Sequence, residues 1–176
     1  MMDATVQQLI ERFAMTPLPV EATYFVSTYR SVADTPAGGP VGTAMIGLYS
    51  ADPPSRSLFH RLEFDEVWHF YGGDQMRLVL LRPDGTSAEV IMGPDVLAGE
   101  VVQYVIPAGV WQAGELVAGG RWALFGCTMA PGFTSTCFEG GLISALIGDY
   151  PGCEADIRRL GIPEDHEPSM PDGFAT

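Results

Sequence analysis

The stretch His60-Arg-Leu-Glu-Phe-Asp-Glu66-Val-Trp-His-Phe-Tyr-Gly-Gly73 combines a strand pattern with titratable side chains. It holds two of the three histidines of the chain, and its last carboxylate lies shortly before a glycine pair. In a β-strand, residues two apart share a face. Glu66, Trp68 and Phe70 therefore share one face of a predicted strand. His60 and Leu62 share one face of the strand that precedes it. The pattern predicts an imidazole and a carboxylate on neighbouring strands, close to large aromatic rings.

Short segments of similar character continue along the chain, separated by Gly, Pro and Asp turns. Pro83-Asp-Gly85 is a hairpin signal. Many short antiparallel strands are typical of a sandwich or a barrel, so an all-β fold is expected. Apolar spacing predicts an N-terminal helix over Thr5–Ala14, capped by Asp3 or Thr5, and two short C-terminal helices. These helices are expected over Gly141–Gly148 and Glu154–Leu160, and the strands over Tyr24–Arg30, Gly42–Tyr49, Leu58–Leu62, Glu66–Tyr71, Met76–Arg82, Ser87–Met92, Val101–Ile106, Trp111–Leu116 and Arg121–Met129.

Length and composition favour one globular domain. The 176 residues are enough for a substantial core, and 47% of them are hydrophobic. We expect a single domain over residues 1–162. The segment 163–176, rich in Pro, Asp and Glu, is expected to be a mobile acidic tail.

Charge and cysteine content exclude several classes of partner. The net charge is −13 and all nine cations are arginine, which disfavours binding to nucleic acid or to an anionic membrane. No run of about 18 apolar residues predicts a membrane span. The first residues carry no basic region ahead of an apolar one, so no secretory signal is expected. Three widely spaced cysteines, Cys127, Cys137 and Cys153, indicate reduced thiols in a cytoplasmic protein.

Two spaced motifs resemble the cupin superfamily. The first cupin signature runs roughly G-x5-H-x-H-x3-E-x6-G, and His60, Glu66 and Gly73 match it. The second runs roughly P-x-G-x2-H-x3-N, and Pro107 and Gly109 match it. Longer strings are similar to one subgroup, the cupin-5 family, also called DUF985. They are Tyr29-Arg-Ser31, His60-Arg-Leu62, Asp65-Glu-Val-Trp-His-Phe-Tyr-Gly-Gly-Asp74, Leu81-Arg-Pro-Asp-Gly85, Pro107-Ala-Gly-Val-Trp-Gln112 and Cys127-Thr-Met-Ala-Pro-Gly-Phe133.

The resemblance implies a double-stranded β-helix, or jelly-roll, barrel, often paired as a homodimer. Such barrels are related in shape to the deoxysugar 3,5-epimerases and to germin-like proteins. Sheet edges that pairing would cover also favour a homodimer. The chain departs from the family pattern in two strings. Val20-Glu-Ala-Thr-Tyr-Phe25 stands where members often have Pro-Glu-Gly-Gly-Tyr-Tyr, and Thr134-Ser-Thr-Cys-Phe-Glu139 keeps only the final Phe-Glu of its counterpart. These departures suggest a pocket reshaped for a different ligand.

The resemblance also bears on metal binding. Leu62 stands where the second metal histidine of the signature would be, and Gln112 stands where the third would be. Transition-metal sites commonly need three or more nitrogen, oxygen or sulfur ligands. His60, Glu66 and Gln112 would make a weak site, so we expect no obligatory metal and no other cofactor, with a weak-metal cupin enzyme as an alternative.

In the cupin register, His60 and Glu66 point into the barrel as candidate acid/base groups, and Gln112 is the candidate that orients a carbonyl or holds an oxyanion. A buried His–Glu pair that only braces the barrel is the structural alternative. His69 is expected on the outer face, and His166 in solvent. The remaining candidates are substrate-binding residues, with structural ion pairs as the alternative for both arginines: Trp68, Phe70, Trp111, Tyr104, Gln103, Arg77 and Arg30.

Two classes of function follow. The first is a cofactor-free isomerase, epimerase, cyclase or dehydratase that acts on a small oxygenated metabolite, because proton abstraction beside a carbonyl needs one tuned base and one oxyanion donor. The second is a module that binds a small molecule without changing it. The lysine-free composition suggests a high-GC bacterium, where such barrels often serve biosynthesis. No GxSxG, P-loop, GxGxxG or HExxH motif supports a hydrolase, nucleotidase or dehydrogenase.

Overall fold

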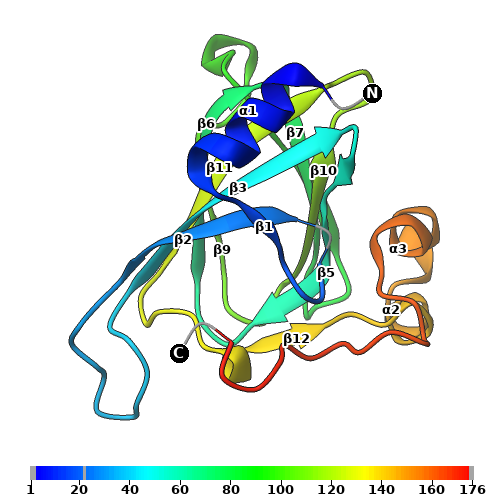
Figure 1. Cartoon of the computed structure of the whole chain (residues 1–176). Helices are drawn as coiled ribbons and strands as arrows, with labels where there is room; N and C mark the ends of the chain where they lie inside the picture. Colours follow the sequence, from blue (N-terminus) through cyan, green and yellow to red (C-terminus); the bar gives the residue numbers. More distant parts are fainter. Residues whose placement is uncertain (1–2, 22, 175–176) are drawn as a thin grey trace.

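Two antiparallel sheets face each other and form a barrel (Figure 1). The computed structural model describes residues 3–21 and 23–174. One sheet has the order β1-β2-β3-β11-β6-β9, with β4 paired to β3, and the other has the order β12-β5-β10-β7-β8. The strands are β1 (Thr16–Pro17), β2 (Tyr24–Arg30), β3 (Thr43–Ala51), β4 (Pro54–Ser55), β5 (Ser57–Leu62), β6 (Glu66–Gly73), β7 (Met76–Leu81), β8 (Ser87–Met92), β9 (Gln103–Ile106), β10 (Trp111–Leu116), β11 (Trp122–Met129) and β12 (Phe138–Gly140).

Three α-helices lie outside the barrel. The N-terminal helix α1 spans Ala4–Phe13, and the Asp3 side chain caps it by accepting a hydrogen bond of 2.8 Å from the Thr5 backbone N–H. Helices α2 (Ile143–Asp149) and α3 (Glu154–Leu160) follow β12. Three 3-10 helices complete the set: η1 (Val96–Ala98), η2 (Ser135–Cys137) and η3 (Pro151–Cys153).

The expected all-β fold with one N-terminal and two C-terminal helices is confirmed. The bounds of β2, β8, β10 and α3 coincide with the sequence-based ranges. Strands β1, β4 and β12 were not predicted, because two or three residues are too few to show a period. Antiparallel strand is thus the commonest secondary structure, and the α-helices lie toward the two ends of the sequence.

Each helix covers the outside of a sheet. Val6 of α1 is fully buried and packs with Leu48 of β3. Ile157 of α3 and Leu146 of α2 pack with Phe59 and Leu81 on the outside of the five-stranded sheet. In Figure 1, α1 crosses β3 and β11, while α2 and α3 stand beside β5. The alternate side chains along these strands point into the barrel.

The barrel interior has two halves. One, here called the packed half, is filled by side chains from both sheets, among which Tyr49, Leu78, Leu80 and Phe125 are almost fully buried. The other, here called the pocket half, is lined by a second apolar cluster that includes Leu62 and Phe138. Since a packed core leaves no room for a ligand, any internal site belongs to the pocket half.

The segment after α3 returns to the barrel. It runs beneath β12 toward the bottom of the molecule (Figure 1). The Pro168 carbonyl accepts a hydrogen bond of 2.9 Å from the Gly140 backbone N–H, and Met170 is buried in the cluster of the pocket half. The expected mobility of residues 163–176 stays a prediction, as does the single domain over residues 1–162. Residues 1–2 and 175–176 of these ranges lie outside the described residues.

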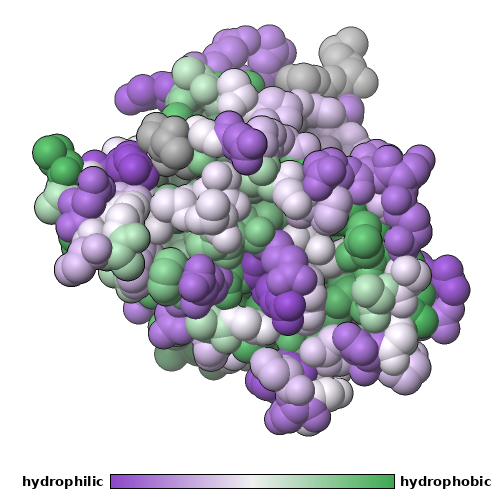
Figure 2. Space-filling view, turned by 90° about the horizontal axis from the view of Figure 1, so that it is seen from below, coloured by the Kyte–Doolittle hydropathy of each residue, from purple (hydrophilic) through white to green (hydrophobic). Residues whose placement is uncertain are grey.

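Among the described residues, no helix is both long and apolar enough to cross a membrane. The underside of the molecule mixes apolar and polar surface, with hydrophobic side chains visible between hydrophilic ones (Figure 2). This underside carries the C-terminal segment and, at one edge, the loop between β2 and β3 (Figures 1 and 2).

Candidate functional site

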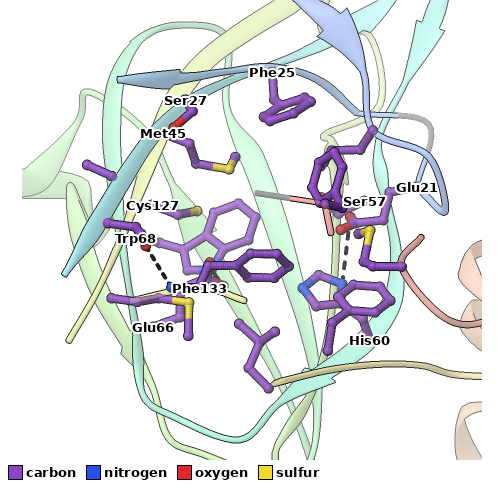
Figure 3. A pocket seen from close by; sticks show the side chains of 18 of the residues that line it. Glu21, Phe25, Ser27, Met45, Ser57, His60, Glu66, Trp68, Cys127 and Phe133 are labelled. Atoms are coloured by element: carbon purple, nitrogen blue, oxygen red, sulfur yellow. Dashed lines mark hydrogen bonds and ion pairs between the residues drawn. The ribbon is translucent and has the colours of Figure 1, made fainter. Parts of the chain in front are cut away.

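A cavity of about 320 Å³ occupies the pocket half of the barrel. Its polar side chains face one another across the space: Glu21, Ser57 and His60 lie on one side, and Glu66 lies on the other (Figure 3). Most of the remaining lining is apolar. The apolar residues are Leu18, Phe25, Ala44, Met45, Leu62, Trp68, Cys127, Met129, Phe133, Phe138, Met170 and Phe174.

The His60 imidazole is fixed by one of its nitrogens. Its Nδ1 lies 2.8 Å from the Leu58 carbonyl oxygen. Because a carbonyl only accepts, this contact assigns the proton to Nδ1 and leaves Nε2 of the neutral ring as an acceptor. The ring is 5% exposed and stacks on Phe138, with centroids 5.2 Å apart. A neutral His60 therefore offers a basic nitrogen inside an apolar cavity.

Glu21 is the second titratable group on this side. Its Oε2 lies 3.6 Å from His60 Nδ1, and the side chains of both residues are almost fully buried. Burial raises the pKa of the Glu21 carboxyl, while the nearby His60 and hydrogen bonds from Ser57 and Thr23 oppose the rise. A protonated His60 would form an ion pair with an ionised Glu21. This carboxylate can therefore stabilise the imidazolium that proton abstraction creates.

Glu66 faces His60 from β6. Burial raises the pKa of its carboxyl, with smaller lowering effects from His60 and from hydrogen bonds with Trp68 and Gln112. The Trp68 indole N–H donates to Glu66 Oε2 and to Gln112 Oε1, both at 2.9 Å. Glu66 is thus held in place, and its raised pKa favours the protonated form that can donate a proton.

A chain of hydroxyl groups connects the cavity to the packed half. The Tyr49 hydroxyl donates to Ser57 Oγ at 2.8 Å, and Ser57 Oγ lies 3.0 Å from Thr23 Oγ1. Thr23 Oγ1 lies 3.5 Å from Glu21 Oε2. A Cβ atom at Gly114 would collide with the Tyr49 hydroxyl, so glycine makes room for the start of this chain. The network supports Glu21 from behind.

Two irregularities in strand pairing bring residues to the cavity that simple alternation would turn away. In β5, Gln112 pairs with His60 but Gly114 pairs with Ser57, so one extra residue places both Ser57 and His60 inward. In β2 the register shifts between Ser27 and Tyr29, and Arg30 consequently joins Ser27 at the cavity. Such bulges commonly redirect side chains at functional sites.

Of the predicted site residues, His60, Glu66, Trp68 and Arg30 line the cavity. Gln112 is 1% exposed and contacts Trp68 through the hydrogen bond above, but it does not line the space. It lies behind the cavity wall, and its expected contact with the substrate stays a prediction.

Three further candidates do not line the cavity. Phe70 and Tyr104 pack against the packed half. They share the inward face of their strands with pocket residues, but they lie at a different height in the barrel. Gln103 is on the outside, where its side-chain amide lies 3.2 Å from His69 Nδ1. Their expected roles in substrate binding stay predictions, which their positions away from the cavity do not support.

Trp111 and Arg77 also lie outside the cavity. Trp111 packs beneath α2 and α3, and the Arg61 guanidinium carbon lies 4.6 Å from the centre of its rings. Arg77 forms ion pairs with Glu89, Glu115 and Asp156. These ion pairs favour the structural alternative for Arg77, because odd-numbered positions of β7 and β10 point outward toward α3.

The remaining two histidines lie where the sequence places them. His69 is on the outer face of β6, with Nε2 3.0 Å from Thr128 Oγ1 and its ring stacked on Tyr71. His166 is largely exposed and lies 3.0 Å from Asp165. Neither side chain reaches the cavity.

The residues at the cupin ligand positions do not fit a transition-metal centre. Leu62 supplies no donor atom, and the oxygens of Glu66 and Gln112 both accept from the Trp68 indole N–H. Within residues 3–21 and 23–174, no group of three or more His, Cys, Asp or Glu side chains could hold a metal ion. The donor set is thus one imidazole and one carboxylate, which is short of a stable site.

Sequence reasoning missed Glu21, Ser57 and the C-terminal residues Met170 and Phe174. Glu21 belongs to a string that diverges from the family pattern, yet it occupies the one acidic position that this string shares with its family counterpart. Ser57 is three residues before His60, so strict alternation places the two side chains on opposite faces; the bulge in β5 brings both to the inner face. The two C-terminal residues carry no motif, and no local pattern predicts where a chain end packs.

Comparison with known proteins identifies the fold. A crystal structure of a Shewanella oneidensis protein superposes with a TM-score of 0.83 at 28% identity, covering 93% of this chain and all of the other. A hypothetical protein from Leishmania major superposes with a TM-score of 0.79 at 27% identity, covering 89% and 98%. An oxalate decarboxylase from Bacillus subtilis, at 13% identity, covers 91% and 41% with a TM-score of 0.52 and shares the fold alone. No protein with a curated description matched.

The family model described as cupin superfamily (DUF985) matches residues 7–140. This range contains both sheets and the side chains that face one another across the cavity, whereas α2, α3 and the C-terminal segment lie beyond it. The expected jelly-roll barrel is thereby confirmed, and this chain belongs to the Cupin_5 family of the cupin superfamily.

Proposed function

We propose that this protein is a cofactor-free acid/base enzyme of the isomerase or epimerase type, acting on a small carbonyl compound. The observation that carries the proposal is the arrangement of His60. Its Nδ1 is held by the Leu58 carbonyl, Glu21 lies 3.6 Å away, and the carboxyl of Glu66 faces the ring across the cavity (Figure 3). This geometry supplies a base on one side of a ligand and an acid on the other.

The reaction would begin with His60. Its Nε2 removes a proton from the carbon beside the carbonyl, the electrons of the C–H bond form a C=C bond, and the carbonyl oxygen gains negative charge. Glu21 stabilises the resulting imidazolium. In its protonated form, which burial favours by raising the pKa, the Glu66 carboxyl returns a proton to carbon from the opposite side. The net result is inversion at the carbon beside the carbonyl. Where that carbon carries a hydroxyl group, its O–H proton passes to the former carbonyl oxygen, and protonation of the former carbonyl carbon moves the hydrogen instead. Glu66 and His60 exchange their protons before the next turnover.

The apolar lining assists this chemistry. Trp68 and the phenylalanine rings exclude water, which strengthens the remaining polar contacts. Gln112 contributes indirectly, since it shares the Trp68 indole N–H with Glu66 and so helps to position both. We assign it a positioning role. Cyclisation or dehydration would use the same two groups, with the proton returned to a different atom.

The test is proton exchange. Wild-type protein is incubated with candidate ketones and aldehydes in D2O, and loss of the α-proton is followed by NMR. His60→Gln is expected to slow exchange by about 10²–10⁴-fold, and Glu66→Gln to slow turnover while leaving the first exchange step less affected. His69→Gln removes an imidazole from the outer face and serves as the matched control. Exchange in the folded His60→Gln variant at the wild-type rate would refute the assignment.

A non-catalytic binding module is the second candidate. Every buried polar side-chain atom in the described part of the chain has a hydrogen-bond partner, as expected of a polar pair that only braces the wall. In that case wild-type protein binds a ligand tightly, and neither exchange nor turnover is detected for any ligand that binds.

We also propose that the protein forms a homodimer in the cytoplasm. The outer face of β6 and β9, which lies away from α1, exposes half of Tyr71 and half of Val105. A second copy could cover these side chains. Sedimentation at micromolar concentration tests this, and a purely monomeric species would refute it. The three cysteines are free, as a reducing compartment would keep them.

A further inference from the structure

The wall of the cavity is mostly apolar. Its polar side chains are those of Glu21, Ser27, Arg30, Thr43, Ser57, His60 and Glu66. The rest is formed by aromatic and aliphatic side chains and Cys127, among them Phe25, Phe133, Met170 and Phe174. A ligand with hydroxyl groups along its whole length would lose hydrogen bonds to water against these apolar side chains and would regain few of them.

Two of these wall residues come from outside the part of the chain that the family model covers. That model ends at residue 140, whereas Met170 and Phe174 belong to the C-terminal segment. Phe174 has its ring centre 5.8 Å from that of Phe25 and 6.3 Å from that of Phe133. The segment therefore completes an aromatic cluster whose other members belong to the barrel.

The segment is attached at two places on its way to the cavity. The Ile162 backbone N–H donates to the Gly141 carbonyl at 2.9 Å, and its carbonyl accepts from the Ile143 N–H at 3.0 Å. Farther on, the Pro168 carbonyl accepts from the Gly140 N–H, and a Cβ atom at Gly140 would collide with this carbonyl. A glycine at position 140 thus allows the close approach that places Met170 over the cavity.

The titratable groups of the cavity lining restrict the charge of the ligand. Glu21 and Glu66 are both buried carboxyls, and Arg30 is the one arginine among the described residues that line the cavity. A carboxylate or phosphate placed beside His60 would face these two acidic groups. The polar end of a ligand is accordingly better matched by a neutral carbonyl.

We propose that the C-terminal residues Met170 and Phe174 form a specificity wall, and that the pocket selects ketones or aldehydes with an apolar hydrocarbon body over polyhydroxylated ones. The proposal rests on the proposed function for the position of the carbonyl beside His60. The apolar body would lie against Met170, Phe174 and the barrel phenylalanines. Nucleotide sugars and free sugars would be poor ligands.

The test compares two butan-2-ones with the full-length protein. Benzylacetone carries a phenyl group on its terminal carbon, whereas erythrulose carries a hydroxyl group on each carbon other than the carbonyl. Binding is measured by ligand-observed NMR, and α-proton exchange is measured in D2O. Benzylacetone is expected to bind at least about tenfold more tightly, because burial of a phenyl ring corresponds to more than one decade in affinity.

Phe174→Ser and Met170→Gln are the test variants, and Phe64→Ser is the matched control. Phe64 packs against the same apolar cluster as Phe174 but does not line the cavity. Both test variants are expected to weaken benzylacetone binding about tenfold, with little change for erythrulose, and the control is expected to stay within about twofold. Melting temperatures of all variants verify folding, and Met170→Gln decides the matter if Phe174→Ser is unfolded.

Equal binding of the two ketones, a preference for erythrulose, no detectable binding of either, or equal effects of Phe174→Ser and Phe64→Ser would each overturn the proposal. Its failure is distinguishable from that of the proposed function. Selective binding without proton exchange would support the specificity wall and refute the proposed enzymatic function. Equally fast exchange of both ketones, abolished by His60→Gln, would support the enzymatic function and refute the specificity wall.

Discussion

The packed and pocket halves of the barrel are made by the same strands, yet one is solid and the other is hollow. Strand β6 places Trp68 between them, and strand β5 contributes only to the pocket half with His60 and Leu62. In the packed half, long side chains such as Leu78 and Phe125 meet across the interior. In the pocket half, the side chains do not meet, and the cavity between them is bordered in part by buried polar groups. The packed half therefore supplies the stability that a hollow site with buried carboxyls does not.

Phe125→Ala should give the largest effect on stability. The ring is fully buried, stacks on Trp68 with centroids 4.8 Å apart and contacts Tyr49 at 4.5 Å. The loss of packing and the cavity left behind should lower the free energy of unfolding by about 3–5 kcal/mol, as measured by urea denaturation. Phe133→Ala in the pocket half, where the ring borders empty space, should cost less than about 2 kcal/mol. Equal costs for the two variants would remove the distinction between the halves.

Glu66→Gln should change the pH dependence of stability. The pKa of the folded carboxyl is raised above its usual value of 4.5, chiefly by burial. Between the unfolded and folded pKa values the folded protein binds more protons, so stability falls as pH rises through this window. The loss is complete above the folded pKa and amounts to about 1.4 kcal/mol for each unit of separation.

Glutamine does not titrate, so the variant should gain stability relative to wild type as pH rises from 4.5. Glu63→Gln, at an exposed position, removes the same charge from the surface and is the control. Urea denaturation of the three proteins across this pH range gives the comparison. Parallel curves for wild type and Glu66→Gln would show that the carboxyl titrates as it does in the unfolded chain.

Arg77→Gln should have a moderate effect on stability and none on the pocket. Its guanidinium joins Glu115 and Asp156, and its removal leaves these neighbouring carboxylates to share Arg159. We expect a loss of about 1–2 kcal/mol in the free energy of unfolding, reduced at high salt. Proton exchange at the proposed site should be unchanged. A selective loss of ligand binding would restore the substrate role that the sequence suggested.

His69→Gln should have the smallest effect. The imidazole lies on the outer face with Thr128 and Gln103 and is separated from the cavity by the sheet. Stability should change by less than about 1 kcal/mol and exchange by less than about twofold. A large loss of activity, measured beside His60→Gln, would mean that the outer face of β6 communicates with the pocket.

Alternation along the strands predicted which face each side chain occupies, and most of the fold followed from it. Alternation does not predict how far along the barrel axis a side chain lies. Phe70 and Tyr104 were therefore expected in the pocket, although they pack in the packed half. Alternation also fails at bulges, which is why Ser57 was missed. Glu21 and His60 meet only because β1 and β2 bring the start of the chain to β5. Such contacts depend on tertiary structure and leave no local signal.

Trp68 has one further consequence. Its indole borders the cavity and shares its N–H with Glu66 and Gln112, whereas Trp111 packs under α2 and α3, and Trp122 packs in the cluster beneath α1. Its surroundings therefore change whenever the cavity fills or Glu66 gains a proton, while those of the other two remain constant. The protein thus carries an intrinsic optical probe: with Trp111 and Trp122 replaced by phenylalanine, fluorescence would report occupancy and the charge of the carboxyl in a single titration.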